Sequence, residues 1–287
     1  MALNRQVLKT RTITSIVFVI VMLCGLLINS WSFLILFLII HFGCWFEYQK
    51  IAGLISRGYV IASPLQKNIT SLAGLGLMMF MCNNFPALYS STLNNFGLYL
   101  ISICLIILLI ACIIERNLQL LLFSLIGFIY ISVSCACMIN LRTTGIISGN
   151  AFSIDFGLIL PLLIIVTVWI NDTMAYIVGS LIGKTQLSKI SPKKTWEGTI
   201  GGALLAIATV TIAGYNFFKA DVEQLIIIST ITCIAGIFGD LFESKLKRMA
   251  NIKDSGKIMP GHGGFLDRFD SLLLAVICVW VYVKLFL

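Results

Sequence analysis

The chain has 287 residues, of which 59% are apolar and only 11% are charged, and its mean hydropathy is +1.01. Soluble proteins are about 45–50% apolar and about 25% charged, so this chain carries too little charge to cover a surface in water. The composition excludes a soluble enzyme, a disordered chain and a secreted disulfide scaffold, and it predicts a polytopic membrane protein.

Apolar runs between polar residues predict about nine membrane-spanning helices, because a bilayer core of about 30 Å takes about 20 helical residues. In chain order these runs cover residues 12–28, 31–50, 68–87, 97–114, 118–140, 156–182, 199–218, 222–243 and 269–286. The first run resembles a signal peptide, but no small-residue cleavage site follows it, so we interpret it as an uncleaved helix. The expected fold class is an all-α polytopic integral membrane protein.

Lysine and arginine residues predict the orientation of these helices, since cytoplasmic loops of membrane proteins are enriched in both. With the N-terminus in the cytoplasm, 17 of the 20 fall on the cytoplasmic side, and only Arg142, Lys219 and Lys284 fall outside. This bias accounts for most of the net charge of +8 without a nucleic-acid partner.

The acidic residues are distributed unevenly, because three of the twelve precede Asn171 and nine follow it. We therefore predict a scaffold of membrane helices over residues 1–150. A catalytic membrane region with cytoplasmic loops is expected over residues 151–287, within one integrated membrane domain. Four polar features of this second region are candidates for a site.

The first feature is the Asn171-Asp172 pair inside an apolar span, where polar and ionisable residues are costly and commonly functional. On a helix, Asp172, Tyr176, Gly179 and Gly183 share one face. The two glycines form a G-x-x-x-G pair that lets another helix come close. The alternative is a packing face with Asp172 near the membrane surface.

The second feature is the loop 190–199 on the expected cytoplasmic side, just before a predicted helix. Its side chains offer donors for phosphate close to a helix N-terminus, which favours anions. The donors are the ammonium groups of Lys193 and Lys194 and the hydroxyl of Thr195, and the neighbouring Ser191 and Glu197 are further candidates for the site. The alternative is a positively charged loop that only fixes the topology.

The third feature lies at residues 239–248, where a predicted span reaches the cytoplasm. Asp240, Ser244, Lys247 and Arg248 share one helical face, with the carboxylate nearest the lipid and the cations nearest water. Lys and Arg at a helix end are ordinary by themselves. Together the four side chains form a group in which the aspartate can coordinate a metal and the cations can hold the phosphate that the metal carries.

The fourth feature is the segment 253–270, where glycines around His262 permit tight backbone geometry. Asp267 and Asp270 flank Arg268 in the expected first turn of the last helix. Carboxylates suit Mg²⁺, which commonly bridges protein carboxylates to substrate phosphates. A capping role explains either aspartate alone but explains the pair poorly. The four features together predict phosphoryl or nucleotidyl transfer to a lipid head group at the cytoplasmic side.

Residues 244–270, SKLKRMANIKDSGKIMPGHGGFLDRFD, resemble the signature of the phosphatidate cytidylyltransferases, also called CDP-diacylglycerol synthases. The matching positions are Ser244, Lys247-Arg248, Lys253-Asp254, Gly256, 262–264, Asp267-Arg268 and Asp270. Met259 departs from the Leu, Ile or Phe that is usual there. The motifs at 171–176 and 191–198 are also similar, so the resemblance covers about the last 120 residues.

The resemblance implies that CTP and phosphatidate give CDP-diacylglycerol and pyrophosphate in a reaction that depends on Mg²⁺. A second cation, monovalent or divalent, is a further candidate cofactor. It implies metal ligands at Asp240, Asp267 and Asp254, and catalytic roles for Asp240, Asp267, Lys247, Arg248, His262 and Asp270. The expected substrate-binding residues are Ser191, Lys193, Lys194, Thr195, Glu197, Ser244, Lys253, Arg268, Asn171 and Asp172. The expected location is a bacterial-type cytoplasmic (inner) membrane, with the active site facing the cytoplasm. The partners are CTP, phosphatidate and the bilayer, with a second copy of the chain as a candidate and no nucleic acid.

The expected mechanism is in-line attack of a phosphatidate oxygen on the α-phosphorus of CTP, with cations stabilising the pyrophosphate that leaves. Phosphatidate is already charged, so His262 would orient its loop or donate a hydrogen bond rather than act as a base. His41, the other histidine, lies in an apolar span and is interpreted as a packed or interfacial residue. Two alternatives stay open: a CTP-dependent polyprenol or phytol kinase, and an ion-coupled transporter, which commonly shows two matching halves.

Overall fold

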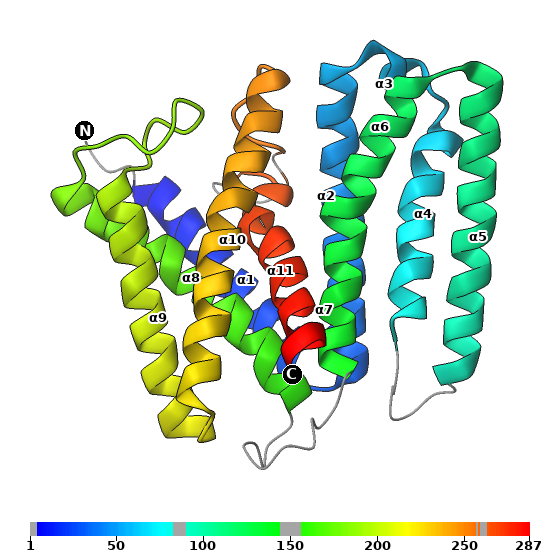
Figure 1. The fold of residues 1–287 in the computed structure, drawn as a ribbon. Helices are drawn as coiled ribbons and strands as arrows, with labels where there is room; N and C mark the ends of the chain where they lie inside the picture. Colours follow the sequence, from blue (N-terminus) through cyan, green and yellow to red (C-terminus); the bar gives the residue numbers. More distant parts are fainter. Residues whose placement is uncertain (1–4, 83–89, 144–155, 257, 259–262) are drawn as a thin grey trace. The chain divides into compact units, whose positions relative to one another are not determined.

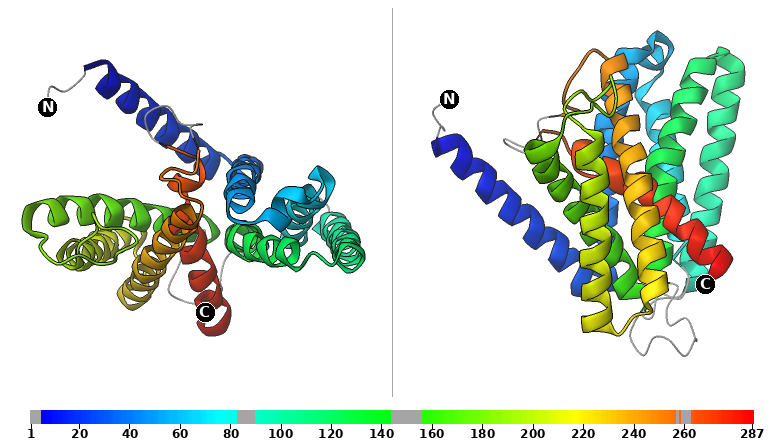
Figure 2. Two further views of the ribbon diagram at one scale, coloured as in Figure 1. Left: turned by 90° about the horizontal axis from the view of Figure 1, so that it is seen from above. Right: turned by 60° about the vertical axis from the view of Figure 1, so that its left-hand side comes forward.

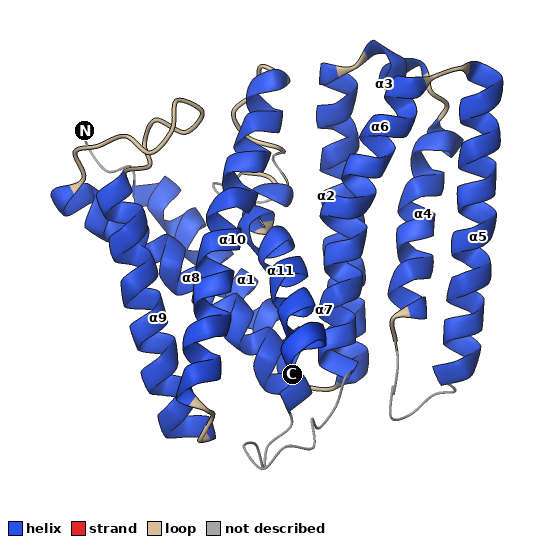
Figure 3. Cartoon of the chain, viewed as in Figure 1, coloured by secondary structure: helices blue, strands red, loops and turns tan. Residues whose placement is uncertain are grey.

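The computed structural model describes residues 5–82, 90–143, 156–256, 258 and 263–287. Over these residues the chain forms helices and no β-strand (Figure 3), and an isolated bridge joins Gln186 and Thr195. The predicted all-α class is therefore confirmed for the described part of the chain.

The helices follow one another closely along the chain (Figure 1). They are α1 (Arg5–Leu27), α2 (Ser30–Ile55), α3 (Arg57–Ile61), α4 (Pro64–Phe80), α5 (Ser90–Glu115), α6 (Leu118–Gly127), the π-helical η1 (Phe128–Val133), α7 (Ser134–Thr143), α8 (Phe156–Ile182), α9 (Trp196–Phe218), α10 (Val222–Met249), the 3-10 helix η2 (Leu266–Arg268) and α11 (Asp270–Phe286). Each of the nine predicted apolar runs overlaps a helix of the structure. The run 118–140 corresponds to α6, η1 and α7 together.

Six helices in the described ranges are long and apolar enough to cross a membrane. They are Ser30–Ile55, Thr92–Ala111, Leu118–Thr143, Gly157–Ile182, Trp196–Phe218 and Val222–Met249. The apolar stretch Thr12–Leu27 of α1 is shorter, and α4 and α11 have 17 residues each. The protein is thus a polytopic integral membrane protein, while the count of nine crossings stays a prediction.

Side chains at the helix starts explain several of the boundaries. Ser63 and Gln66 form a capping box at the start of α4, in which each side chain accepts a hydrogen bond from the other residue's backbone N–H. Thr195 caps α9 by accepting a hydrogen bond from the backbone N–H of Gly198 at 3.2 Å. These side chains satisfy N–H groups that have no partner inside the first helical turn.

The chain packs as two compact units. The first unit comprises Met1–Ile139 and Leu246–Phe269, and the second comprises Asn140–Lys245 and Asp270–Leu287. The boundary falls inside α10, whose last turn belongs to the first unit. Residues 246–269 therefore pack with the N-terminal helices, although the sequence assigns them to the catalytic region. The predicted division at residue 150 concerns the roles of the two regions, and it stays a prediction.

In the first unit, α4 and α5 lie side by side (Figure 1, Figure 2) and α1 packs on α2. Helix α2 supplies much of the core, with Trp45 and Tyr48 fully buried. The imidazole Nε2 of His41 lies 3.0 Å from the hydroxyl of Ser132 in η1, and Trp45 Nε1 donates to the same hydroxyl at 2.9 Å. His41 is fully buried in this contact, so its interpretation as a packed residue is confirmed.

In the second unit, α8 and α9 pack against each other along their lengths (Figure 2). The predicted close approach at Gly183 is confirmed, because a Cβ atom there would lie 2.5 Å from Thr195 Oγ1 at the start of α9. A Cβ atom on Gly202 of α9 would lie 2.5 Å from the backbone nitrogen of Ala175 in α8. Small residues thus allow the two backbones to touch.

Candidate active site

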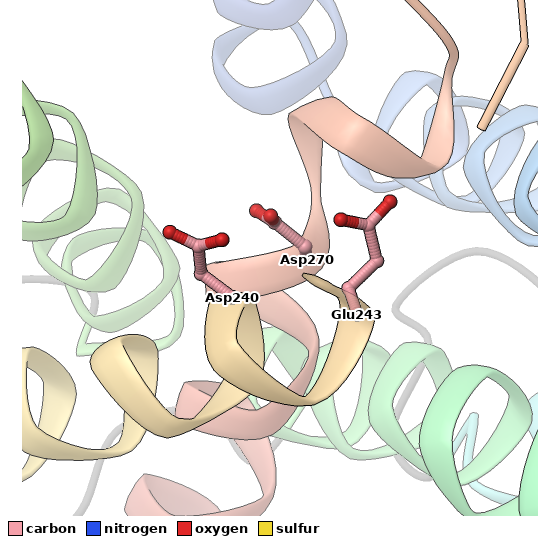
Figure 4. A group of neighbouring side chains, drawn as sticks. All are labelled: Asp240, Glu243 and Asp270. Atoms are coloured by element: carbon pink, nitrogen blue, oxygen red, sulfur yellow. The ribbon is translucent and has the colours of Figure 1, made fainter. Parts of the chain in front are cut away.

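Three acidic side chains of the second unit gather in one place: Asp240 and Glu243 from α10, and Asp270 from the first residue of α11 (Figure 4). One carboxylate oxygen from each residue lies within 4.8 Å of the other two. Asp240 and Glu243 share a face because residues three apart are neighbours on a helix. Asp270 comes close because Gly239 leaves room for it: a Cβ atom on Gly239 would lie 2.5 Å from the Asp270 carbonyl oxygen. We call these three side chains the carboxylate cluster.

The donor set of the carboxylate cluster fits Mg²⁺, which prefers oxygen ligands and commonly binds through one or two carboxylates plus substrate phosphates. Glu243 is fully buried, and the Asp240 side chain is 19% exposed. Asp240 and Asp270 are among the residues predicted from the sequence, and the structure brings them together. Glu243 was missed, although its spacing of three residues from Asp240 was a usable signal.

Two side chains of the second unit contact Asp240. Lys194, from the loop before α9, forms an ion pair with Asp240 Oδ2. The hydroxyl of Ser244 donates a hydrogen bond to Asp240 Oδ1 at 3.2 Å. The structure thus places a predicted phosphate-binding lysine against a predicted metal ligand.

The loop between α8 and α9 is closed at its base by Glu197. Its carboxylate accepts hydrogen bonds from the backbone N–H groups of Lys184 at 3.2 Å and Thr185 at 3.1 Å. Trp196 N–H also donates to the Thr185 carbonyl at 2.9 Å. Both carboxylate oxygens of Glu197 therefore contact the protein's own backbone, and this contact fixes the two ends of the loop.

The remaining predicted binding residues of this unit lie on the same loop and on α8. Lys193 is exposed and Ser191 is partly exposed, and the Ser191 carbonyl accepts a hydrogen bond from the Lys194 N–H at 3.1 Å. On α8, Asn171 is buried and Asp172 is exposed, with 3.5 Å between Asn171 Nδ2 and Asp172 Oδ1.

In the first unit, Asp267 is surrounded by hydrogen-bond donors. Lys247 Nζ lies 2.6 Å from Asp267 Oδ1, and the backbone N–H groups of Ser255 and Gly264 donate to Oδ2 at 3.0 and 2.7 Å. Gly263 has φ +88°, in the left-handed region that favours glycine, just before the amide of Gly264. The Asp267 carboxylate is thus held by an ammonium group and two amides.

A second acid of the first unit, Glu47 on α2, reaches the same segment and is fully buried. Its Oε2 accepts hydrogen bonds from the hydroxyl of Ser255 at 2.6 Å and from the backbone N–H of Leu266 at 2.8 Å. Sequence reasoning gave Glu47 no role, because it is an isolated acid in the region interpreted as scaffold. Its position inside an apolar span was the signal that could have found it.

The other predicted residues of the first unit lie mainly at the surface. Four of them are exposed: Arg248, Lys253, Asp254 and Arg268. Arg248 Nη1 donates a hydrogen bond to the Ile252 carbonyl at 3.3 Å. His262 lies outside the described residues, so its expected role stays a prediction.

Comparison with known proteins gives one match to a family model over nearly the whole chain and matches to curated relatives over about half of it or less. The model of a family described as the cytidylyltransferase family matches residues 9–286. Several curated proteins named phosphatidate cytidylyltransferase match parts of the chain. The protein from Rickettsia typhi is 40% identical over 158 residues, which are 52% of this chain and 65% of the relative.

Two further relatives with the same name are similar over shorter segments. The protein from Helicobacter pylori is 39% identical over 127 residues, 44% of this chain and 48% of the relative. The protein from Staphylococcus haemolyticus is 46% identical over 111 residues, 38% of this chain and 43% of the relative. The chain thus spans about half the length of the curated relatives that it matches. Because the family model covers nearly every residue, the chain belongs to the cytidylyltransferase family.

Proposed function

We propose that this protein is a phosphatidate cytidylyltransferase, which converts CTP and phosphatidate into CDP-diacylglycerol and pyrophosphate. The observation that carries the proposal is the carboxylate cluster with Lys194 beside it, in a membrane protein of the cytidylyltransferase family. Carboxylates for a cation and an ammonium group for phosphate are the parts that nucleotidyl transfer requires. The names of the relatives give the substrates.

Asp240, Glu243 and Asp270 are the residues proposed to hold Mg²⁺. When bound, the cation supplies charge neutralisation at the phosphates of CTP. Asp267 and Asp254, which the resemblance implies as metal ligands, stay proposals, as does a second cation.

The side chains of the chain itself are proposed to bind and orient the two phosphate-bearing substrates. Ser191, Lys193, Lys194 and Thr195 would contact phosphate oxygens, together with Lys247 and Arg248. A phosphatidate oxygen forms the new bond to the α-phosphorus of CTP, and the bond to pyrophosphate breaks. The nucleophile is already an anion, so the step needs no general base. Ammonium and guanidinium groups stabilise the charge that develops on the pyrophosphate.

We further infer nine membrane crossings with a cytoplasmic N-terminus, in a bacterial-type inner membrane, with the active site facing the cytoplasm. The support is the distribution of Lys and Arg, 17 of 20 on one side, and the bacterial origin of several relatives. A homodimer remains a candidate assembly.

The test is an assay of detergent-solubilised protein with phosphatidate, labelled CTP and Mg²⁺. We expect a CDP-lipid and pyrophosphate, in amounts that depend on phosphatidate. Release of CDP with a phosphorylated lipid would instead indicate the kinase alternative. An Asp240→Asn variant should form far less CDP-lipid, and Glu223→Gln, which changes an exposed acid at the other end of α10, is its matched control.

A further inference from the structure

Glu47 is a buried acid on an apolar helix of the N-terminal region, and its contacts lie far away along the chain. A buried carboxylate is costly unless it accepts hydrogen bonds, so its partners indicate what it stabilises. Both donors to Glu47 Oε2 belong to the segment 246–269: Ser255 is 208 residues away and Leu266 is 219 residues away. Helix α2 thus supplies the acceptor for a segment that carries Asp267.

Ser255 connects Glu47 to Asp267. Its hydroxyl donates to Glu47 Oε2 at 2.6 Å and accepts a hydrogen bond from the backbone N–H of Asp267 at 3.3 Å. Its own backbone N–H donates to Asp267 Oδ2 at 3.0 Å. One residue therefore holds both the main chain and the carboxylate of Asp267, and Glu47 fixes the hydroxyl of that residue.

Two glycines show that the segment is built around the Glu47 carboxylate. A Cβ atom on Gly256 would overlap Glu47 Oε1, and a Cβ atom on Gly264 would overlap Glu47 Oε2 and the Ser255 hydroxyl. Any side chain at either position would push the loop backbone off the carboxylate. The amide of Gly264 also donates to Asp267 Oδ2 at 2.7 Å, so the same close packing serves Asp267.

We propose that Glu47 is a positioning residue of the active site: through Ser255 and the start of η2 it orients Asp267 toward Lys247. The inference rests on the proposed function, because Asp267 and Lys247 take their roles in the reaction from it. Lys247 Nζ lies 2.6 Å from Asp267 Oδ1, and both side chains are largely buried, at 13% and 11% exposure. A shift of the Asp267 carboxylate would therefore move the ammonium group that pairs with it.

His41 provides a matched control for Glu47. It lies on the same helix, is equally buried and also contacts a serine hydroxyl, but that serine is in η1 rather than in the segment 246–269. A change at His41 therefore disturbs α2 without removing an acceptor from the loop. Loss of general stability should appear in both variants, whereas loss of positioning should appear only at Glu47.

The first measurement is turnover per folded molecule for Glu47→Gln, Glu47→Ala and His41→Gln, with folded protein quantified by size-exclusion chromatography. Outer residues that orient active-site ligands typically contribute roughly 10- to 100-fold. We expect kcat to fall about 10-fold in Glu47→Gln, which keeps one acceptor oxygen, and about 100-fold in Glu47→Ala. KM for CTP should change by roughly twofold or less, and His41→Gln should keep the wild-type kcat.

A double variant tests the route through Ser255. If Glu47 acts through this hydroxyl, Glu47→Ala combined with Ser255→Ala should be no slower than the slower single variant. If the two single losses of kcat multiply in the double variant, Glu47 does not act through the Ser255 hydroxyl. Wild-type kcat in Glu47→Ala, or an equal loss in His41→Gln, would overturn the proposal itself.

Hydrogen exchange separates this inference from the proposed function, since it needs no turnover. Amides of residues 252–256 and 263–269 should exchange faster in both Glu47 variants and at the wild-type rate in His41→Gln, with α9 peptides unchanged in all three. If the wild-type protein forms no CDP-lipid, the proposed function fails, and the exchange data alone decide the positioning role. Unchanged exchange in Glu47→Ala would then overturn it.

Discussion

The acids of the carboxylate cluster in the second unit lie close to one another, whereas the Asp267 carboxylate of the first unit lies among hydrogen-bond donors. In the cluster, three acids place oxygens within 4.8 Å of one another, and Lys194 contacts one of them. Two like charges about 4 Å apart repel by about 4 kcal/mol at an effective dielectric constant of 20. Asp267 instead faces an ammonium group and two amides. A cation therefore stabilises the cluster most, whereas Asp267 is already stabilised by the protein.

The largest expected effect comes from the cluster. Asp240→Asn removes one anionic ligand and should lower CDP-lipid formation on the order of 10³-fold, since a bound cation contributes several kcal/mol to transition-state stabilisation. Rates measured over a range of Mg²⁺ concentrations should show a raised requirement for the cation. Glu223→Gln on the same helix should behave as wild type. Near-normal turnover of Asp240→Asn would remove the cluster from the mechanism.

The next effect is expected at Asp267. Asp267→Asn breaks a largely buried ion pair with Lys247, and loss of one partner of such a pair lowers the free energy of unfolding by about 3 kcal/mol. Separately, we expect kcat per folded molecule to fall on the order of 10²-fold, because the Lys247 ammonium group loses the carboxylate that orients it. If the protein rather than a cation stabilises Asp267, the Mg²⁺ concentration that gives half-maximal activity should rise less in Asp267→Asn than in Asp240→Asn. An equal shift would show that Asp267 also binds the metal, as the resemblance implies.

A smaller effect is expected at Lys194, whose side chain is 32% exposed beside Asp240. Lys194→Gln removes one ammonium group and should lower kcat/KM for CTP roughly tenfold, because water screens a partly exposed charge. Lys189→Gln, an exposed lysine of the same loop, is the matched control for the change in loop charge. A loss as large as that of Asp240→Asn would place Lys194 among the essential groups.

The smallest effect on turnover is expected at Glu197, which resembles Asp267 in accepting hydrogen bonds from backbone amides. Glu197→Gln should lower the free energy of unfolding by about 1–2 kcal/mol and change kcat/KM only a few-fold. Thermal unfolding in detergent and steady-state kinetics measure the two quantities. A loss of activity above roughly tenfold without a change in thermal stability would favour the predicted contact with substrate.

Much of the fold could be predicted because hydropathy and helix length have a direct physical link in a membrane. The predicted run 222–243 ends early, since α10 continues to Met249 through polar residues that hydropathy does not count as helix. The π-helical turn η1 interrupts a continuous apolar run and has no sequence signal that we recognise.

The candidate site could be predicted only in part. Asp240 and Asp270 were predicted as polar residues in apolar surroundings, and Glu243 could have been added from helical spacing. Their meeting across two helices depends on the space beside Gly239, which the sequence does not reveal. Glu47 could not be connected to Ser255 because no local pattern joins residues 208 positions apart.

The separation of 208 residues between Glu47 and Ser255 also sets an order of events during synthesis. At roughly 5–20 residues per second, Ser255 leaves the ribosome about 10–40 s after Glu47. Throughout this interval, α2 carries a carboxylate whose later donors do not yet exist. The loop around Asp267 can close only when the last part of the chain arrives, on an acceptor that was made first. A fragment holding only the motif-bearing last 120 residues would therefore lack the group on which its loop is assembled.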